Sequence, residues 1–224
     1  MNNDTYTTTL DTVAATIKKG MYLSVKRIFD LFFSIIGLVF LIPLAIVVKI
    51  IYVCHNDFHS IFFVQDRIGK NGKLFKFFKF RTMIPDADAV LEKLLEEDLD
   101  LAKEYKINKK LKNDPRITKI GKLLRKFSLD ELPQMINIFL GDMSLIGNRP
   151  YLPREIPDMG DYYEEIIKTK PGLTGYWQVS GRNNVTFKDR LRLEKEYSQI
   201  AGFRLDVKIF FKTFKVVVFG KGAE

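Results

Sequence analysis

Two residue types that build many functional sites are nearly absent from this sequence. It has one cysteine, Cys54, and two histidines, His55 and His59. A lone thiol excludes an intramolecular disulfide and fits a reducing compartment. The histidines flank Asp57, but further ligands are missing nearby, so interfacial polar residues are a better interpretation than a metal site.

Nucleotide-binding signatures and repeats are also missing. Neither a GxGxxG nor a P-loop pattern occurs, which disfavours a Rossmann-type enzyme or a kinase. No internal repeat is visible, and no small-residue cleavage site follows the one long apolar run, so a signal peptide is excluded.

What the sequence does have is positive charge and phenylalanine. The 224 residues carry a formal net charge of +9, and 46% of them are hydrophobic. This length suits one catalytic domain with an extra element. The charge indicates acidic partners: nucleic acid, anionic lipid or phosphorylated substrates.

An uncharged apolar stretch runs from Leu31 to Val48. As a straight helix it is long enough to cross a bilayer. Pro43 near its middle removes one backbone hydrogen bond and bends the helix. Two interpretations stay open: a spanning helix with a kink, or a helix broken at Pro43 that enters and leaves by the same face.

The flanking charges bear on this choice. Basic residues precede the apolar stretch and a long basic domain follows it, so by the positive-inside rule both ends prefer the cytoplasm. A re-entrant helix-break-helix over residues 21–56 would satisfy both ends. We expect the Thr-rich residues 1–20 to be a mobile tail and residues 57–224 to form the cytosolic domain.

Basic and aromatic residues alternate between Ile61 and Thr82. The pattern predicts two strands, 61–64 and 74–81, joined by a glycine-containing turn. Lys79 and Arg81 are two residues apart and share a face, where they could grip a phosphate or simply face water. Such interleaving also suits single-stranded nucleic acid, which keeps a membrane-tethered nucleic-acid binder as an alternative.

Four helices are predicted from apolar periodicity: an acidic one over 86–106, a basic one over 119–127, a charged one over 187–199 and a basic one over 208–219. The second and the fourth have the pattern of amphipathic helices that lie on a membrane surface. The expected fold class is α+β: mostly helical, with a small hairpin, a Pro-broken membrane helix and interfacial helices.

The central motif is Ser128-Leu129-Asp130-Glu131-Leu132-Pro133-Gln134. Ser128 and Glu131 have capping-box spacing, so a helix is expected to start here, with Asp130 kept ionised by the helix dipole. One carboxylate could attack a phosphorus while the other holds a metal. The alternative is a plain helix cap.

A glycine-rich segment lies further along, from Lys170 to Asn183. Its three glycines let the backbone approach a bulky ligand, and Arg182 near its end can clamp a phosphate through two hydrogen bonds.

Taken together, these blocks resemble the bacterial sugar transferase family, the monotopic phosphoglycosyl transferases that use polyprenyl phosphate. The resemblance covers nearly the whole chain after about Met21. It rests on many ordered blocks: Lys26 to Asp30, Gln65 to Gly69, Lys79 to Met83, Asp114 to Thr118, Leu124-Arg125, Ser128 to Gln134, Gly141 to Ser144 and Lys170 to Asn183.

The resemblance implies an activity. Asp130 and Glu131 would form a catalytic dyad with Mg²⁺, and Asp130 would attack the sugar-bearing phosphate of a UDP-sugar, release UMP and hold the phospho-sugar covalently. Undecaprenyl phosphate would then accept it, which is the first membrane step of polysaccharide assembly. Phosphoryl transfer is catalysed mainly by positioning and charge neutralisation, which two carboxylates with Mg²⁺ can supply.

The resemblance also implies site residues and a location. The positions that match the family's phosphate-binding residues are Arg125, Arg149 and Arg182, with Lys79 and Arg81 as weaker candidates, and Ser128 and Glu194 would support the site. The protein would sit in the bacterial inner membrane with its catalytic domain on the cytoplasmic face, bound to lipid and not to nucleic acid. A homodimer is left open.

Two positions depart from the family pattern. Asn148 replaces the usual Pro, and Glu194 replaces the usual Asp. Both replacements are mild, so we expect activity to be retained, with sugar specificity in segments 84–113 and 151–170. The rival hypothesis from another class is a non-catalytic membrane-surface protein in which Asp130-Glu131 only caps a helix.

Overall fold

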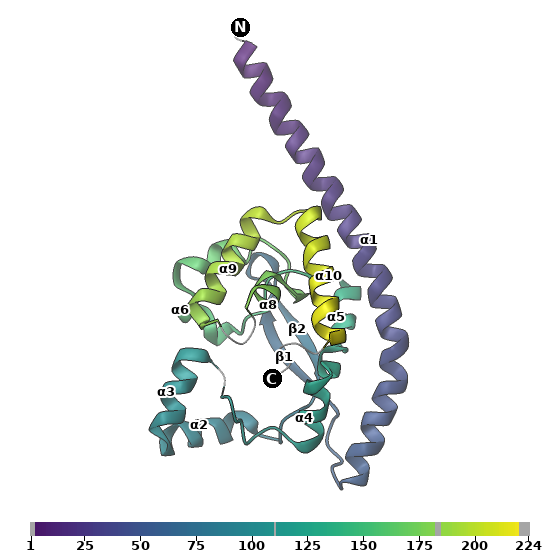
Figure 1. Cartoon of the computed structure of the whole chain (residues 1–224), viewed down its shortest axis with the longest axis vertical. Coiled ribbons are helices and arrows are strands. Elements are labelled where there is room, and N and C mark those ends of the chain that lie inside the picture. Colours follow the sequence, from purple (N-terminus) through teal and green to yellow (C-terminus); the bar gives the residue numbers. More distant parts are fainter. Residues whose placement is uncertain (1–2, 110, 182–184, 220–224) are drawn as a thin grey trace.

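The computed structural model describes residues 3–109, 111–181 and 185–219, of which 3–15 and 216–219 are described by their backbone alone. Within these residues the fold is mostly helical, with two small two-stranded sheets. The α+β prediction is confirmed at this level. A long helix, α1 (Asn3–Cys54), runs along one side of the remaining elements (Figure 1).

Helix α1 is continuous through Pro43, so the predicted break is not confirmed. It curves along the domain (Figure 1). One missing N–H is tolerated because packing holds both flanks: Leu41 and Val48 are buried in one cluster with Phe80. Residues 3–20, expected as a tail, continue the same helix.

The face of α1 that points away from the domain is exposed. Residues 16–54 are long and apolar enough to cross a membrane. Large exposed apolar side chains follow this face, namely Ile28, Phe29, Phe32, Ile35, Ile36, Val39, Phe40, Ile42, Ile46, Val47, Ile50 and Val53. A surface of this extent favours contact with lipid.

Polar contacts fasten α1 to the domain at several levels. Asp30 is buried and accepts hydrogen bonds from Ser144 Oγ (3.0 Å) and from the Leu145 amide (2.8 Å). Near the end of the helix the Tyr52 hydroxyl donates to the Arg81 carbonyl. The helix therefore lies along the domain from residue 30 to residue 52.

The predicted hairpin is present. Strand β1 (Phe62–Ile68) pairs antiparallel with β2 (Leu74–Phe80), across the short helix η1 (Lys70–Gly72). The first strand is longer than predicted because Gln65 to Ile68 also pair with β2.

The predicted acidic helix is two helices, α2 (Ala87–Glu97) and α3 (Leu99–Asn108). Asp98 separates them because it has an extended backbone and its side chain accepts hydrogen bonds from Asp100 and Leu101 amides. The predicted basic helix is confirmed as α4 (Lys119–Lys126), with Thr118 as its N-cap.

The middle of the chain contributes a second sheet. After the short helix η2 (Leu129–Glu131) and α5 (Gln134–Leu140), β3 (Ser144–Ile146) pairs in parallel with β4 (Gly172–Thr174). A Cβ on Gly172 would lie 2.1 Å from the Gly147 amide nitrogen, so these two segments approach too closely for a side chain.

The remaining helices follow η2 and α5 along the chain. They are η3 (Pro153–Glu155), α6 (Ile156–Met159), η4 (Gly160–Tyr162), α7 (Tyr163–Ile166), α8 (Tyr176–Ser180), α9 (Phe187–Ile200) and α10 (Phe203–Phe219). Helices α9 and α10 match the predicted segments, although α10 begins earlier. Ile209 of α10 and Tyr197 of α9 are buried in one cluster with Ile146, which places both helices over β3.

Candidate active site

The central motif lies in a turn between α4 and α5. Ser128 has a left-handed backbone (φ 54°) and its side chain caps nothing, so the predicted capping box is absent. A box needs an extended N-cap residue, which this conformation excludes. Helix α5 begins only at Gln134, and Asp130 and Glu131 instead lie in the three-residue helix η2.

Lys79 joins the two carboxylates. Its Nζ lies 3.4 Å from Oδ2 of Asp130 and 3.1 Å from Oε1 of Glu131. The two acids differ in access, because the Asp130 side chain is 8% exposed and that of Glu131 is 39% exposed. One carboxylate is therefore enclosed, and the other is open to solvent.

A buried asparagine fixes the strand that carries Lys79. Asn137 of α5 accepts a hydrogen bond from the Phe78 amide (3.1 Å) and donates to the Lys76 carbonyl (2.6 Å). Because Asn137 is fully buried, these bonds lock β2 against α5 and hold the lysine beside the acids.

The charge of Asp130 depends on neighbouring cations. Burial raises the pKa of this carboxyl, and the positive charges of Lys79 and Arg125 oppose that rise. Arg125 is itself held by a hydrogen bond from Nε to Thr82 Oγ1 (3.0 Å). A three-residue helix has little macrodipole, so these two cations, rather than the predicted helix dipole, favour the ionised form.

The dyad fits part of a magnesium site. Carboxylate oxygens are the donors that Mg²⁺ prefers, and it needs only one or two carboxylates plus substrate oxygens. Within the described part of the chain, no three His, Cys, Asp or Glu side chains gather as a metal site. An ion held by Asp130 and Glu131 would therefore take its other ligands from substrate and water.

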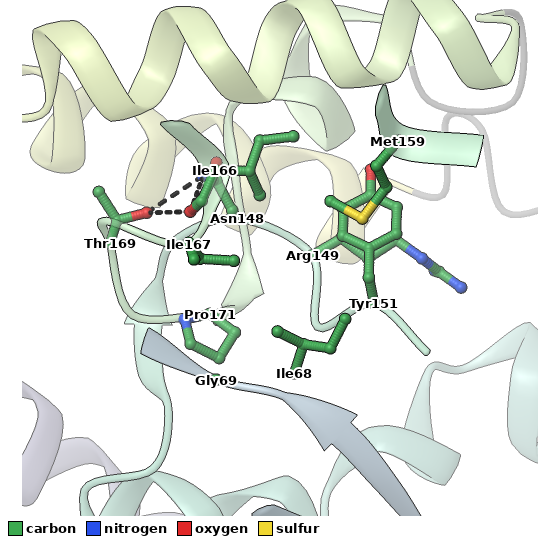
Figure 2. Close-up of a pocket in the computed structure, with 10 residues that line it drawn as sticks. All are labelled: Ile68, Gly69, Asn148, Arg149, Tyr151, Met159, Ile166, Ile167, Thr169 and Pro171. Atoms are coloured by element: carbon green, nitrogen blue, oxygen red, sulfur yellow. Dashed lines mark hydrogen bonds between the residues drawn. The ribbon is translucent and has the colours of Figure 1, made fainter. Parts of the chain in front are cut away.

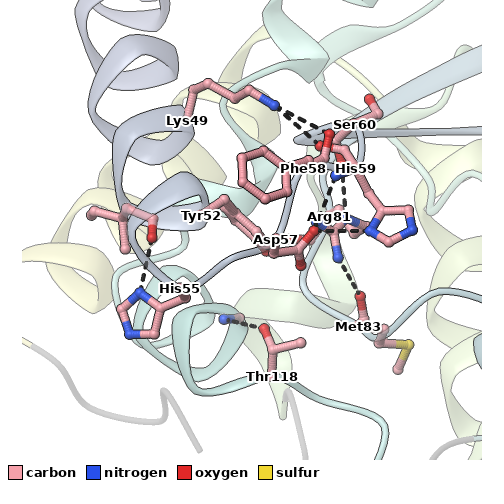
Figure 3. Close-up of polar contacts among 12 residues, drawn as sticks. Lys49, Tyr52, His55, Asp57, Phe58, His59, Ser60, Arg81, Met83 and Thr118 are labelled. Atoms are coloured by element: carbon pink, nitrogen blue, oxygen red, sulfur yellow. Dashed lines mark hydrogen bonds and ion pairs between the residues drawn. The ribbon is translucent and has the colours of Figure 1, made fainter.

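Arg81 contacts the end of α1 and the loop before β1, and not the two carboxylates. Its guanidinium pairs with Asp57 (2.9 Å), donates to the Ser60 carbonyl from Nε (2.8 Å) and lies over the Tyr52 ring (4.4 Å; Figure 3). Asp57 also contacts His59 Nδ1 at 3.0 Å. With these partners the side chain holds α1 to the hairpin, so the structure does not bring Arg81 to Lys79 as a phosphate grip.

Arg149 and Glu194 form a second group. Oε1 of Glu194 accepts a hydrogen bond from the Arg149 amide (2.8 Å), and the carboxyl is fully buried. Burial raises its pKa to about 7, while Tyr151, Arg149 and Arg190 oppose the rise. Glu194 therefore supports the backbone of Arg149.

Three arginines meet around this group, two of which the sequence analysis did not select. Burial and the charge of Arg149 lower the pKa of Arg67 to about 9, and burial, together with the charge of Arg149, also lowers the pKa of Arg190. Each of the three has an Nε without a hydrogen-bond partner among the described residues. The i, i+4 spacing of Arg190 and Glu194 on one helix was the signal that could have indicated this cluster.

The pocket beside Arg149 is too small for a nucleotide. It has a volume of about 10 Å³, room for roughly one water. Figure 2 shows the Arg149 guanidinium pointing away from Asn148 and Thr169. Nδ2 of Asn148 lies within hydrogen-bond distance of Thr169 Oγ1 (3.1 Å) and Ser198 Oγ (2.7 Å), so the departure at this position makes contacts that proline lacks.

The contacts of the predicted site residues define two groups. Asp130, Glu131, Lys79 and Arg125 form one group and Arg149 with Glu194 another, whereas Arg182 lies outside the described residues. Ser128 makes no side-chain cap, and its left-handed backbone forms the turn that leads into η2, the helix of Asp130 and Glu131.

Comparison with known proteins shows which family the chain matches. Residues 21–220 match the bacterial sugar transferase family model. The chain is 40% identical over 198 residues to the exopolysaccharide production protein ExoY of Sinorhizobium fredii, covering 88% of this chain and 87% of that protein.

Longer relatives match as well. The chain is 42% identical to the undecaprenyl-phosphate galactose phosphotransferase of Salmonella typhimurium, covering 88% of this chain and 41% of that protein. It is 34% identical to the undecaprenyl-phosphate glucose phosphotransferase of Komagataeibacter xylinus, covering 88% of this chain and 36% of that protein. The chain therefore belongs to the bacterial sugar transferase family.

Proposed function

We propose that this protein transfers a phospho-sugar from a UDP-sugar to undecaprenyl phosphate and releases UMP, as the first membrane step of polysaccharide or capsule assembly. The observation that carries the proposal is the enclosed Asp130 carboxylate held beside Lys79 and Glu131. Relatives named as undecaprenyl-phosphate galactose and glucose phosphotransferases support the substrate class.

The reaction has two displacements. An Asp130 oxygen attacks the sugar-linked phosphorus, the bond from that phosphorus to the bridging oxygen breaks, and UMP leaves with the electron pair. A phosphate oxygen of undecaprenyl phosphate then attacks the same phosphorus and displaces the Asp130 carboxylate. A carboxylate nucleophile divides the transfer in this way into two easier steps.

The surrounding charges have distinct tasks. Lys79 and Arg125 oppose the burial-driven rise in the pKa of Asp130 and would face the negative charge that develops on the phosphate. Arg149, supported by Glu194, and Arg182 bind substrate phosphates. Mg²⁺, when bound through Asp130 and Glu131, would neutralise phosphate charge.

We also infer that α1 enters the cytoplasmic leaflet without crossing the bilayer. The helix contacts the same domain at Lys26, which pairs with Asp206, and at Tyr52 beside Arg81. A helix fastened to one polar domain at residues 26 and 52 cannot place those two points on opposite sides of the membrane. Tags at residues 1 and 224 should both be labelled from the cytoplasmic side, and labelling from opposite sides would overturn this topology.

Replacement of Asp130 by Asn tests the activity. The amide keeps the shape but removes the nucleophile, so UMP release from UDP-sugars with undecaprenyl phosphate and Mg²⁺ should vanish. Incubation with a UDP-sugar alone should add the mass of a phospho-sugar to the wild-type chain and not to Asp130→Asn. Retained UMP release would rule out Asp130 as the nucleophile, whereas wild-type protein that releases no UMP from any UDP-sugar would favour the rival function, a non-catalytic membrane-surface protein.

A further inference from the structure

An apolar groove lies between the first part of α1 and helix α10. Its volume is about 280 Å³, well above the roughly 150 Å³ cavity that admits a benzene molecule. Side chains from both helices and from β3 line it: Phe29, Phe33, Leu145, Val207, Phe210 and Phe211. Phe33 and Phe210 meet across it, with ring centroids 5.3 Å apart.

The charged groups in this lining are already paired. Lys26 forms an ion pair with Asp206, whose carboxylate also accepts hydrogen bonds from Tyr22 and Tyr197 (2.8 Å each). Asp30 is occupied by Ser144 and Leu145. The interior is therefore suited to hydrocarbon and offers little to a polar ligand.

The groove opens onto the exposed apolar surface. Phe29 is 50% exposed and Phe211 is 66% exposed, so both lining residues also face outward. On α10 a stripe of exposed basic side chains runs beside the apolar residues, and none of its members has an ion pair within the described part of the chain: Arg204, Lys208, Lys212 and Lys215. An apolar slot with cations along its edge matches a lipid with an anionic headgroup.

We propose that this groove binds one acyl chain of an anionic membrane phospholipid, with the basic stripe of α10 contacting the lipid phosphate. The bound lipid would join α1 and α10 at the membrane surface. This site is distinct from the dyad and does not depend on the proposed reaction, because neither Asp130 nor Lys79 lines the groove.

The test is photo-crosslinking of the full-length protein in detergent with phosphatidylglycerol that carries a diazirine on one acyl chain. Peptide mapping should place the label on residues 22–33 and 203–211. Label spread evenly over the exposed face of α1, including residues 35–53, would overturn the proposal.

A matched pair of variants tests the groove itself. Val207→Trp fills it, whereas Val53→Trp makes the same change at an equally exposed position outside it (38% each). Labelling should fall several-fold in the first variant and stay unchanged in the second. Equal labelling of both would contradict the proposal.

Surface variants provide an independent arm that does not disturb packing. Lys208→Gln with Lys212→Gln should weaken phosphatidylglycerol labelling about fivefold for each lysine and leave phosphatidylcholine labelling unchanged. Lys93→Gln, on the exposed acidic helix α2, is the control. Loss of labelling on addition of equimolar undecaprenyl phosphate would assign the groove to the isoprenoid chain and overturn the phospholipid proposal.

Discussion

The Nζ of Lys79 lies 3.4 Å from Oδ2 of Asp130, at the edge of a buried site. This contact favours the ionised form of the proposed nucleophile, because burial raises the pKa of Asp130 and the charge of Lys79 is the largest influence that lowers it. Lys79 on β2 thus influences the protonation of Asp130, which lies much further along the chain.

Lys79→Met should therefore shift the acid limb of the pH–rate profile. Without the ammonium the pKa of Asp130 rises further, so the pH at which UMP release reaches half its maximum should rise. Rate profiles between pH 5 and 9 measure this. Lys76→Met, on the same strand but paired with Asp66, is the control, and an unmoved acid limb in Lys79→Met would argue against the role.

The Glu194 carboxyl predicts a pH-dependent stability. Its pKa rises from 4.5 to about 7 on folding, so the folded state binds a proton that the unfolded chain releases. This contribution is complete below about pH 4.5 and is lost as the pH rises through 7. Glu194→Gln should match the wild type below about pH 4 and exceed its unfolding free energy by about 3 kcal/mol at pH 8.

Thermal melting across this range measures the effect, with exposed Glu164→Gln as the control. A constant difference between Glu194→Gln and the wild type at all pH values would contradict the raised pKa.

Arg81→Lys should destabilise the fold without impairing substrate binding. Lysine cannot reproduce the fork that contacts Asp57 and the Ser60 carbonyl, so we expect a loss of about 2 kcal/mol. Melting temperature and KM for the UDP-sugar separate the two roles, with exposed Arg192→Lys as the control. A raised KM at unchanged melting temperature would restore Arg81 as a phosphate ligand.

Asp30→Ala should loosen α1 from the domain. The substitution leaves Ser144 Oγ and the Leu145 amide without their acceptor, at a cost of about 3 kcal/mol. Melting in detergent and limited proteolysis report the loosening. Asp161→Ala, at an exposed position, should leave both unchanged; equal stability of the two variants would show that α1 is held by packing alone.

Local patterns predicted the elements whose signal lies within one segment. The periodicity over 119–127 gave α4, and the alternation after Leu74 gave β2. The parallel pair of β3 and β4 was missed because each strand has three residues and their partners are far apart in sequence. The split at Asp98 was missed because its apolar spacing continues on both sides, and only the local cap interrupts it.

The site was predicted in composition but not in arrangement. The motif and the family resemblance selected Asp130, Glu131 and Lys79, which the structure does bring together. The position of Arg81 depends on tertiary contacts. Its side chain lies over Tyr52, near the end of α1, and pairs with Asp57 in the loop that follows. Sequence spacing could not indicate that these groups would meet.

Fastening α1 at Asp30 and again at Tyr52 has a consequence for how such a chain can change. Each residue advances a helix by roughly 100°, so a single insertion between these anchors would rotate one of them away from its partner. Substitutions on the bare side disturb neither anchor. The part of α1 between Asp30 and Tyr52 should thus tolerate many substitutions among apolar side chains, but no insertion or deletion.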